Sequence, residues 1–457
     1  MSDICSWNTA NKPNGRDGDA TENSPLLVIG NHLANHENDA VNGDSGNKTL
    51  RYLFNSTHTP GTVSTKIVVR CSSQAWHITK VSLLSNYVNF LLVMAPLGIV
   101  AGKLHWSPTV DFIIYFLAII PLAAVLSFAT DQISMRLGEA LGGLLNATFG
   151  NAVEVIVSIV ALKKGQIEVV QSSMLGSILS NLLLVMGMSF FLAGIVNMRN
   201  RVTGQGMEQS FASATAQTTC SLMTLSSASL VIPATLYSVL DKNESVKKEH
   251  SILVLSRGTA IVLLFLYLHS HSNIFDTEIQ HRNEEEPEEP IIGPIAAAVV
   301  LAVTTVLVAI CADYLIESIN PIVETAHVSK NFIGIIVIPI VGNAAEHVTA
   351  VLMAIRDKMD LAINIAIGSS IQIALLVTPF LVILGWAVLD KPMTLHFETF
   401  ETVAFMFSVL VVTYTVQDGK SNYLEGAMLL GLYCIIALAF YISPSGALDT
   451  LLLFVEA

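Results

Sequence analysis

Apolar residues gather in long runs that polar residues interrupt at similar intervals from Asn86 to the C-terminus. A helix that crosses a bilayer needs about 20 mostly apolar residues. Eleven runs come close to that length or exceed it, and between Leu361 and Leu389 there is no charged side chain. The pattern therefore predicts an all-α polytopic membrane protein, with transmembrane helices near 86–102, 110–129, 143–162, 169–196, 209–238, 251–268, 291–316, 331–355, 361–389, 396–416 and 423–443.

The first 65 residues differ from the rest because they are rich in Asn, Asp, Gly, Ser and Thr and contain no run long enough to span a membrane. This composition predicts a disordered tail without a cleavable signal peptide. Residues 65–85 then mix basic and apolar side chains, which is typical of a short amphipathic segment at a membrane surface. The Lys and Arg residues divide almost evenly between the two sides, so a cytosolic N-terminus is only the working orientation.

Composition agrees with a membrane protein. The chain has 457 residues, of which 52% are hydrophobic and only 13% are charged, about half the usual charged fraction of a soluble protein. The formal net charge of -13 gives no basic surface for a nucleic acid. The five cysteines lie far apart, which argues against a disulfide framework or a zinc site.

An internal repeat is the strongest signal in the chain. The string Gly150-Asn151-Ala152-Val153-Glu154 recurs 192 positions later as Gly342-Asn343-Ala344-Ala345-Glu346, and a Gly-Ser pair begins 22 positions after each glutamate, at Gly176 and Gly368. A second match at the same offset indicates duplication. The two motifs lie five apolar runs apart, and an odd number inverts the orientation. The sequence therefore predicts an inverted repeat, with a binding site near the middle of the membrane.

The two motif glutamates need a partner inside the membrane. A carboxylate near the bilayer centre costs about 2.5–3.5 kcal/mol on insertion scales. The nearest basic residues, Lys163, Lys164 and Arg356, are at the helix ends, about two turns away or more. Glu154 and Glu346 are therefore expected to repel each other unless a divalent cation or protons neutralise them.

The other polar residues of the repeats carry oxygen and no thiol. Hard oxygen ligands in a flexible cage suit calcium, which accepts six to eight of them, and argue against soft metals. Because the same carboxylates can hold protons, calcium and protons would compete for one site. The predicted transport residues are Glu154, Glu346, Asn151, Asn343, Gly150, Gly342, Ser177, Ser180, Ser369 and Gln372.

Structural roles for these residues stay open: an interhelical hydrogen bond for the glutamates, helix association for the asparagines, and packing for the serines and Gln372. His347 follows Glu346 but has no counterpart in the first repeat, where Val155 stands. It is interpreted as a proton relay, with an ordinary packed role as the alternative.

An acidic run interrupts the chain between the two halves. Five carboxylates occupy six positions and repel one another unless cations screen them. The run is either a solvated linker or a segment that collects cations near the mouth of the transport path. Its members are Glu284, Glu285, Glu286, Glu288 and Glu289.

The two Gly-Asn-Ala-x-Glu segments, together with Ser173-Met174-Leu175-Gly176-Ser177 and Ala366-Ile367-Gly368-Ser369-Ser370-Ile371-Gln372, resemble those of the vacuolar calcium/proton exchangers, and most closely their fungal members. That family is part of the calcium/cation antiporter superfamily. The resemblance covers the chain from Asn86 to the C-terminus. The long N-terminal tail is where the chain resembles the family least.

The resemblance implies one extra N-terminal helix followed by two inverted five-helix repeats. The implied divisions are a cytosolic tail (1–65), an amphipathic segment with the first helix (66–109), the first repeat (110–270), a cytosolic acidic linker or helix (271–290) and the second repeat (291–457). It also implies residence in the vacuolar membrane. There the chain would exchange cytosolic calcium for luminal protons, with Glu154 and Glu346 as the transport glutamates.

The sequence predicts a transporter and no enzyme. Its expected partners are calcium ions, protons and the lipid bilayer, without a resident cofactor. Manganese as a further cargo and a homo-oligomeric state are left open. The alternatives are a manganese/proton or sodium/calcium antiporter with the same glutamates, and a passive calcium channel. An intramembrane hydrolase is disfavoured, since Glu346-His347 lacks the second His of a zinc peptidase.

Overall fold

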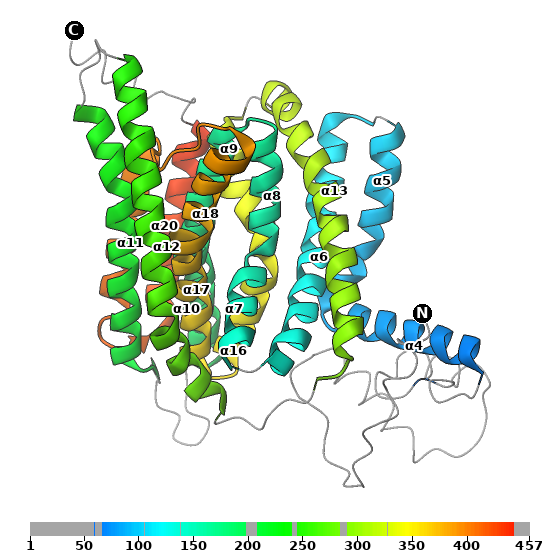
Figure 1. Ribbon diagram of the computed structural model, residues 1–457. Helices are drawn as coiled ribbons and strands as arrows, with labels where there is room; N and C mark the ends of the chain where they lie inside the picture. The colour runs from blue at the N-terminus through cyan, green and yellow to red at the C-terminus, as the bar shows by residue number, and fades with distance from the viewer. Residues whose placement is uncertain are drawn as a thin grey trace.

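The computed structural model describes Thr59 and residues 66–104, 106–137, 139–197, 208–239, 245–283, 290–326 and 328–442. Its helices stand side by side as an upright bundle, and the helix α4 lies across one end (Figure 1). The N-terminal tail and the acidic run Glu284–Glu289 fall outside the described residues.

Helices follow one another through the first half of the chain, with one short strand near its end. A π-helical segment, η3, interrupts the span that begins with α9. The elements are α4 (Ile67–Leu84), the 3-10 helix η2 (Tyr87–Val93), α5 (Met94–Leu104), α6 (Pro108–Leu137), α7 (Glu139–Gly150), α8 (Ala152–Lys163), α9 (Ile167–Leu179), η3 (Ser180–Val185), α10 (Met186–Val196), the strand β1 (Gln209–Ser210), α11 (Ser213–Val239) and α12 (Ser245–Asn283).

The second half repeats this plan. Three π-helical segments, η5, η6 and η7, interrupt its spans. The elements are α13 (Pro294–Ala326), α14 (Lys330–Phe332), η5 (Ile333–Val337), α15 (Ile338–Gly342), α16 (Ala344–Ile355), α17 (Met359–Gln372), η6 (Ile373–Val377), α18 (Thr378–Leu384), η7 (Gly385–Leu389), α19 (Thr399–Thr415), the strand β2 (Lys420–Ser421) and α20 (Tyr423–Ile442).

The predicted fold class is confirmed, since each of the eleven apolar runs falls on helical structure. Within the described ranges, seven helices are long and apolar enough to cross a membrane, or nine if each bent pair of helices is one span. The helix α19 is apolar but shorter. Eleven spans therefore stay a prediction. One detail departs from an all-α chain: β1 and β2 form a short antiparallel pair, with Gln209 opposite Ser421.

The segment after the tail forms the helix α4, and a bend of 115° separates it from the helix that follows. Val68 and Trp76 are exposed on α4, whereas Lys80 and Val81 are buried. In Figure 1 this helix lies at a steep angle to the bundle, as an interfacial helix would.

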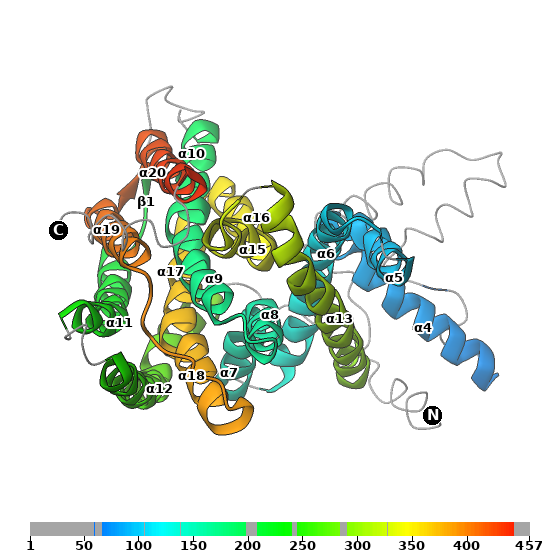
Figure 2. The same cartoon turned by 90° about the horizontal axis from the view of Figure 1, so that it is seen from above.

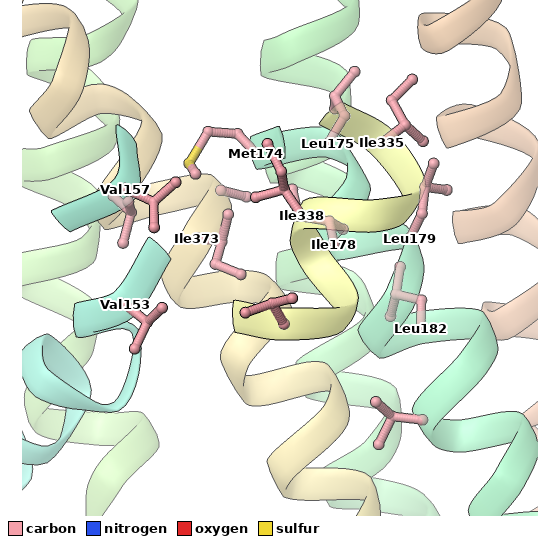
Figure 3. Packing of buried hydrophobic residues seen from close by; sticks show 14 of the residues in the cluster. Val153, Val157, Met174, Leu175, Ile178, Leu179, Leu182, Ile335, Ile338 and Ile373 are labelled. Atoms are coloured by element: carbon pink, nitrogen blue, oxygen red, sulfur yellow. The ribbon is translucent and has the colours of Figure 1, made fainter. Parts of the chain in front are cut away.

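The first long helix of each half packs against its counterpart. Of the described elements, α6 and α13 share the most extensive contact, and Figure 2 shows them side by side. The rings of Tyr115 and Tyr314 stack with their centroids 5.0 Å apart, and the Tyr115 hydroxyl donates to the Gly98 carbonyl at 2.7 Å. Buried aliphatic side chains of α8, α9, η5 and α15 fill the middle of the molecule beside this pair (Figure 3).

The two motif helices run in opposite directions. In Figure 1, α7 lies below α8, so the first motif helix rises from the end of the molecule that carries α4. The second descends toward that end, where α16 lies. Its two parts, Lys330–Gly342 and Ala344–Ile355, meet at a bend of 60°. Both repeats therefore deliver their Gly-Asn-Ala-x-Glu segment to the interior, from opposite ends.

Candidate functional site

A break at an asparagine divides each motif helix. In the first repeat α7 ends at Gly150, Asn151 has φ -99° and ψ 24°, and α8 begins at Ala152. In the second, α15 ends at Gly342 and Asn343 has φ -87° and ψ 6° before α16 begins. The matching angles show that the duplicated sequence folds in the same way twice.

Each break places a glutamate in the first turn of a new helix. Glu154 lies in the first turn of α8, and Glu346 lies in that of α16. The N-terminus of a helix carries a partial positive charge, which stabilises a negatively charged group placed beside it. Such discontinuous helices are the usual way in which transporters expose helix ends and backbone groups to an ion near the midplane.

The two carboxylates are brought together inside the protein. Glu154 is 6% exposed, and its carboxylate packs against Gly342, four residues before the half-buried Glu346. The Oε2 atom of each is buried without a hydrogen-bond partner. Lys164 forms ion pairs with Asp313 at 2.8 Å and Glu317 at 3.0 Å, so its charge is neutralised there.

Hydrogen bonds connect each motif asparagine to the other repeat. The Asn151 amide donates to Gln372 Oε1 at 2.7 Å, and its Oδ1 accepts from the Ser369 hydroxyl at 3.0 Å. The Asn343 amide donates to the Ser177 carbonyl at a longer 3.4 Å. Asn151 and Asn343 are fully buried. The predicted polar residues of both repeats therefore form one shared cluster.

His347 and Ser180 also meet across the repeats. The Ser180 hydroxyl lies 3.1 Å from His347 Nε2. Ser180 is fully buried, and His347 is 9% exposed. The proton-relay role of His347 stays a prediction, but the contact places this ring beside a predicted transport residue.

One polar member of the cluster, Asn181, was not among the residues predicted from the sequence. Its side chain is fully buried, and its amide donates to the Ser369 hydroxyl at 3.0 Å. Its own Oδ1 is buried without a partner. An amide inside the apolar run 169–196, directly after Ser180, is the signal that could have identified it.

The motif glycines are packed differently in the two repeats. A Cβ at Gly342 would collide with the Glu154 carboxylate, and a Cβ at Gly176 would collide with the Ile335 carbonyl. Pro339 leaves that carbonyl without its usual helical donor, and the carbonyl meets α9 at Gly176. Their counterparts Gly150 and Gly368 have no such neighbour within 4 Å. The cluster is therefore packed more tightly around Gly342 and Gly176 than around Gly150 and Gly368.

The chemistry of the cluster is that of oxygen ligands. Two carboxylates, four amides and several hydroxyls line the cluster without a thiol, and four of the buried oxygens have no hydrogen-bond partner: those of Glu154, Glu346, Asn181 and Asn343. No group of three or more His, Cys, Asp or Glu side chains that could hold a metal occurs in the described part of the chain. A metal ion here would have two carboxylates and would complete its coordination with neutral oxygens, which suits a hard divalent cation.

Comparison with known proteins gives the family. The family model of the sodium/calcium exchanger protein matches residues 107–271 and 296–442. A vacuolar calcium ion transporter of Schizosaccharomyces pombe is 47% identical over an alignment of 376 residues, and the match covers 80% of this chain and 87% of the relative. A Ca²⁺/H⁺ antiporter of Synechocystis is 41% identical over an alignment of 375 residues, and the match covers 78% of this chain and 97% of the relative.

Solved structures give the same fold. Native YfkE has a TM-score of 0.65 and 35% identity, and the match covers 78% of this chain and all of that chain. The H⁺/Ca²⁺ exchanger CAX has a TM-score of 0.56 over 80% of this chain and 93% of that chain, but only 13% identity, so it supports the fold alone. The resemblance read from the two motifs is therefore confirmed: the chain belongs to the sodium/calcium exchanger family, among relatives named vacuolar calcium transporters and calcium/proton antiporters.

Proposed function

We propose that this protein is a secondary active antiporter that moves calcium into the vacuole in exchange for luminal protons. One observation carries the proposal: helices of opposite direction deliver two carboxylates to the interior, each with a buried oxygen that has no hydrogen-bond partner, and neither forms an ion pair with a basic side chain among the described residues. The names of the relatives support calcium and protons as the two substrates and the vacuolar membrane as the location.

Calcium occupies the space between Glu154 and Glu346 in this proposal. Their unpaired oxygens supply the two negative charges, and the side chains of Asn343 and Asn181 have buried oxygens ready to complete the shell. Calcium accepts such mixed sets of carboxylate and amide oxygens. Asn151 holds this shell in place through its hydrogen bonds to Gln372 and Ser369 of the other repeat.

Protons replace calcium on the same two oxygens. Two carboxylates that repel each other away from water favour their neutral forms whenever no cation lies between them. The doubly charged empty site is the most expensive state, because moving uncompensated charge through a dry interior is unfavourable. This penalty prevents the empty site from changing sides, and it couples calcium transport to proton transport.

The inverted repeat provides the two access states. In the described conformation Gly342 packs on Glu154, while Gly150 is open. Exchange of the two repeat conformations would pack Gly150 on Glu346 and open the site toward the end where α8 meets α9. With the N-terminus in the cytosol, the described conformation faces the cytosol.

The proton gradient is large enough for this work. Each pH unit is worth about 1.4 kcal/mol per proton. Two or three protons that move down two pH units therefore supply about 5–8 kcal/mol against the calcium gradient.

The test is calcium uptake into reconstituted vesicles, driven by an imposed pH gradient without sodium. We expect uptake by the wild type and its abolition by Glu154→Gln and by Glu346→Gln. Glu168→Gln, which removes an exposed carboxylate in the first turn of α9, is the matched control and should transport normally. Normal uptake by a folded Glu154→Gln variant would contradict the site. Uptake that requires sodium, or flux only down the calcium gradient, would favour a sodium/calcium antiporter or a channel.

A further inference from the structure

Arg257 is a charged residue on the outer side of a transmembrane helix. It lies within the apolar span Glu249–His269 of α12. Figure 2 shows this helix at the edge of the bundle, and it packs against α11 and α18. Val254 and Ile261, three residues before Arg257 and four after it, are both exposed, so this face of the helix meets lipid. A charged side chain at such a position is rare and needs a polar or oppositely charged partner.

The contacts of its neighbours place Arg257 near the surface of the membrane. Ser256 accepts a hydrogen bond from the Leu395 amide at 3.0 Å, and Leu395 belongs to the connection between η7 and α19. Gln171, in the second turn of α9, donates to the Thr394 carbonyl of the same connection at 3.0 Å. The ends of α9, η7 and α19 therefore lie at the level of Arg257. The headgroup region of a bilayer begins where transmembrane helices end, so a lipid phosphate lies within reach of this side chain.

The guanidinium has an aromatic partner but no acidic one. Its Cζ lies 4.9 Å from the centroid of the Trp386 ring, which is a cation–π contact between α12 and η7. No acidic side chain forms an ion pair with it in the part of the chain that the structure describes. Its Nε is buried without an acceptor. Because the side chain is only half-buried, an anion can reach its terminal nitrogens from the lipid side.

The surface beside Arg257 has room for an acyl chain. A Cβ at Gly258 would meet nothing within 4 Å, so the helix surface is recessed at this point. Ile261 and Phe265 follow on the same face, one and two turns further toward the middle of the membrane, and both are exposed. A positive charge at the surface with an open apolar stripe beneath it matches the layout of a phospholipid, whose phosphate lies above its acyl chains.

We propose that Arg257 and Trp386 form a binding site for a phospholipid, in which the guanidinium holds the phosphate and an acyl chain lies along the exposed face of α12. Arginine suits this ligand because its planar set of donors can bind two phosphate oxygens at once. The bound lipid adds a link between α12 and η7. Since α12 also packs against η6, which begins directly after Gln372, the lipid supports the outer wall of the transport cluster. The inference does not depend on which ions the protein exchanges.

The test is thermal unfolding of the purified protein in detergent with increasing amounts of dioleoylphosphatidylglycerol. A ligand that binds only the folded protein raises its Tm. Two further arms contain dioleoylglycerol, which has the chains without the phosphate, and inorganic phosphate, which has no chains. We expect phosphatidylglycerol alone to raise the Tm of the wild type. An equal rise with dioleoylglycerol would show that the phosphate is not recognised, and an equal rise with inorganic phosphate would show a site for free anions; either result would overturn the proposal.

Substitutions at the site measure the part played by each side chain. Arg257→Gln should raise the half-saturating concentration of phosphatidylglycerol by about tenfold or more, the usual loss for a hydrogen bond to a charged group. Arg257→Lys keeps the charge but not the paired donors, so its shift should be smaller. Trp386→Leu keeps the arginine and removes the ring, and it should weaken binding by about twofold to fivefold.

Arg136→Gln is the matched control. Arg136 lies in the last turn of α6, and its guanidinium already donates to the Ile292 carbonyl at 3.2 Å. Its loss should leave the half-saturating concentration of phosphatidylglycerol at the wild-type value, whatever it does to the Tm without lipid. Equal half-saturating concentrations for the wild type, Arg257→Gln and Trp386→Leu would refute the site. A shift in Arg136→Gln as large as that in Arg257→Gln would refute it as well, because it would indicate a general effect of charge.

Discussion

Adding one methyl group at Gly342 should act very differently from adding it at the equivalent Gly150. A Cβ at Gly342 would overlap the Glu154 carboxylate and lie 3.0 Å from its Cδ, whereas a Cβ at Gly150 meets nothing within 4 Å. Overpacking of a buried site costs about 1–3 kcal/mol. The same substitution in open space instead gains a few tenths to about 1 kcal/mol, because alanine restricts the unfolded chain.

The cost at Gly342 applies to the described conformation. A penalty of 1–3 kcal/mol lowers its population relative to other states by about 5-fold to 150-fold. Because the methyl group also displaces a carboxylate, Gly342→Ala should weaken calcium binding in detergent, measured with labelled calcium, and should lower the Tm of the purified protein. Gly150→Ala should leave the Tm unchanged or raise it slightly.

The two variants can be compared directly because each changes Gly to Ala at the last residue of a half-helix, and the two positions are equivalent in the repeats. Equal changes in Tm and calcium affinity would refute the packing difference between Gly342 and Gly150. A larger loss in Gly150→Ala would indicate that the purified protein prefers the opposite conformation.

Two further predictions concern polar residues outside the carboxylate pair. Asn151→Ala should lower stability by about 1–3 kcal/mol, because it removes the donor to Gln372 Oε1 and the acceptor of the Ser369 hydroxyl; Asn343→Ala should cost less, because its bond to Ser177 is long at 3.4 Å. Thermal unfolding of the two variants ranks them, and a reversed order would contradict the hydrogen-bond assignment. Deletion of Glu284–Glu289 should change the apparent calcium affinity or the maximal uptake rate by more than it changes Tm. Unchanged uptake kinetics would make the acidic run a simple linker.

Much of the fold could be predicted because the bilayer imposes a strong pattern. Runs of about 20 apolar residues mark spans whatever their neighbours are, so helical structure was expected where it is found. The internal repeat could also be predicted, because Glu154 and Glu346 share both a motif and a following Gly-Ser pair. The opposite directions of the two motif helices could be predicted because the motifs lie five apolar runs apart.

The breaks and the asymmetry could not be predicted, because they depend on tertiary packing. Nothing in the string around Asn151 shows that α7 ends one residue earlier, since asparagine also occurs inside helices. Asn181 was missed because its position in the second repeat holds Ile373, so the duplication does not mark it. The repeats have nearly the same motif at Gly150 and Gly342, yet only one of these glycines touches a carboxylate.

The bonds from Asn151 to Ser369 and Gln372 have a consequence for biosynthesis. When the ribosome has made the first half, the Asn151 amide still lacks its partners, because they are encoded more than 200 codons downstream. Neither half can satisfy this amide alone, so the first half carries an unpaired polar group in the membrane until the second half has inserted. A gene split between the halves would need to restore that pairing in trans, and an ancestral half-length protein would have had to find it in a second copy of itself.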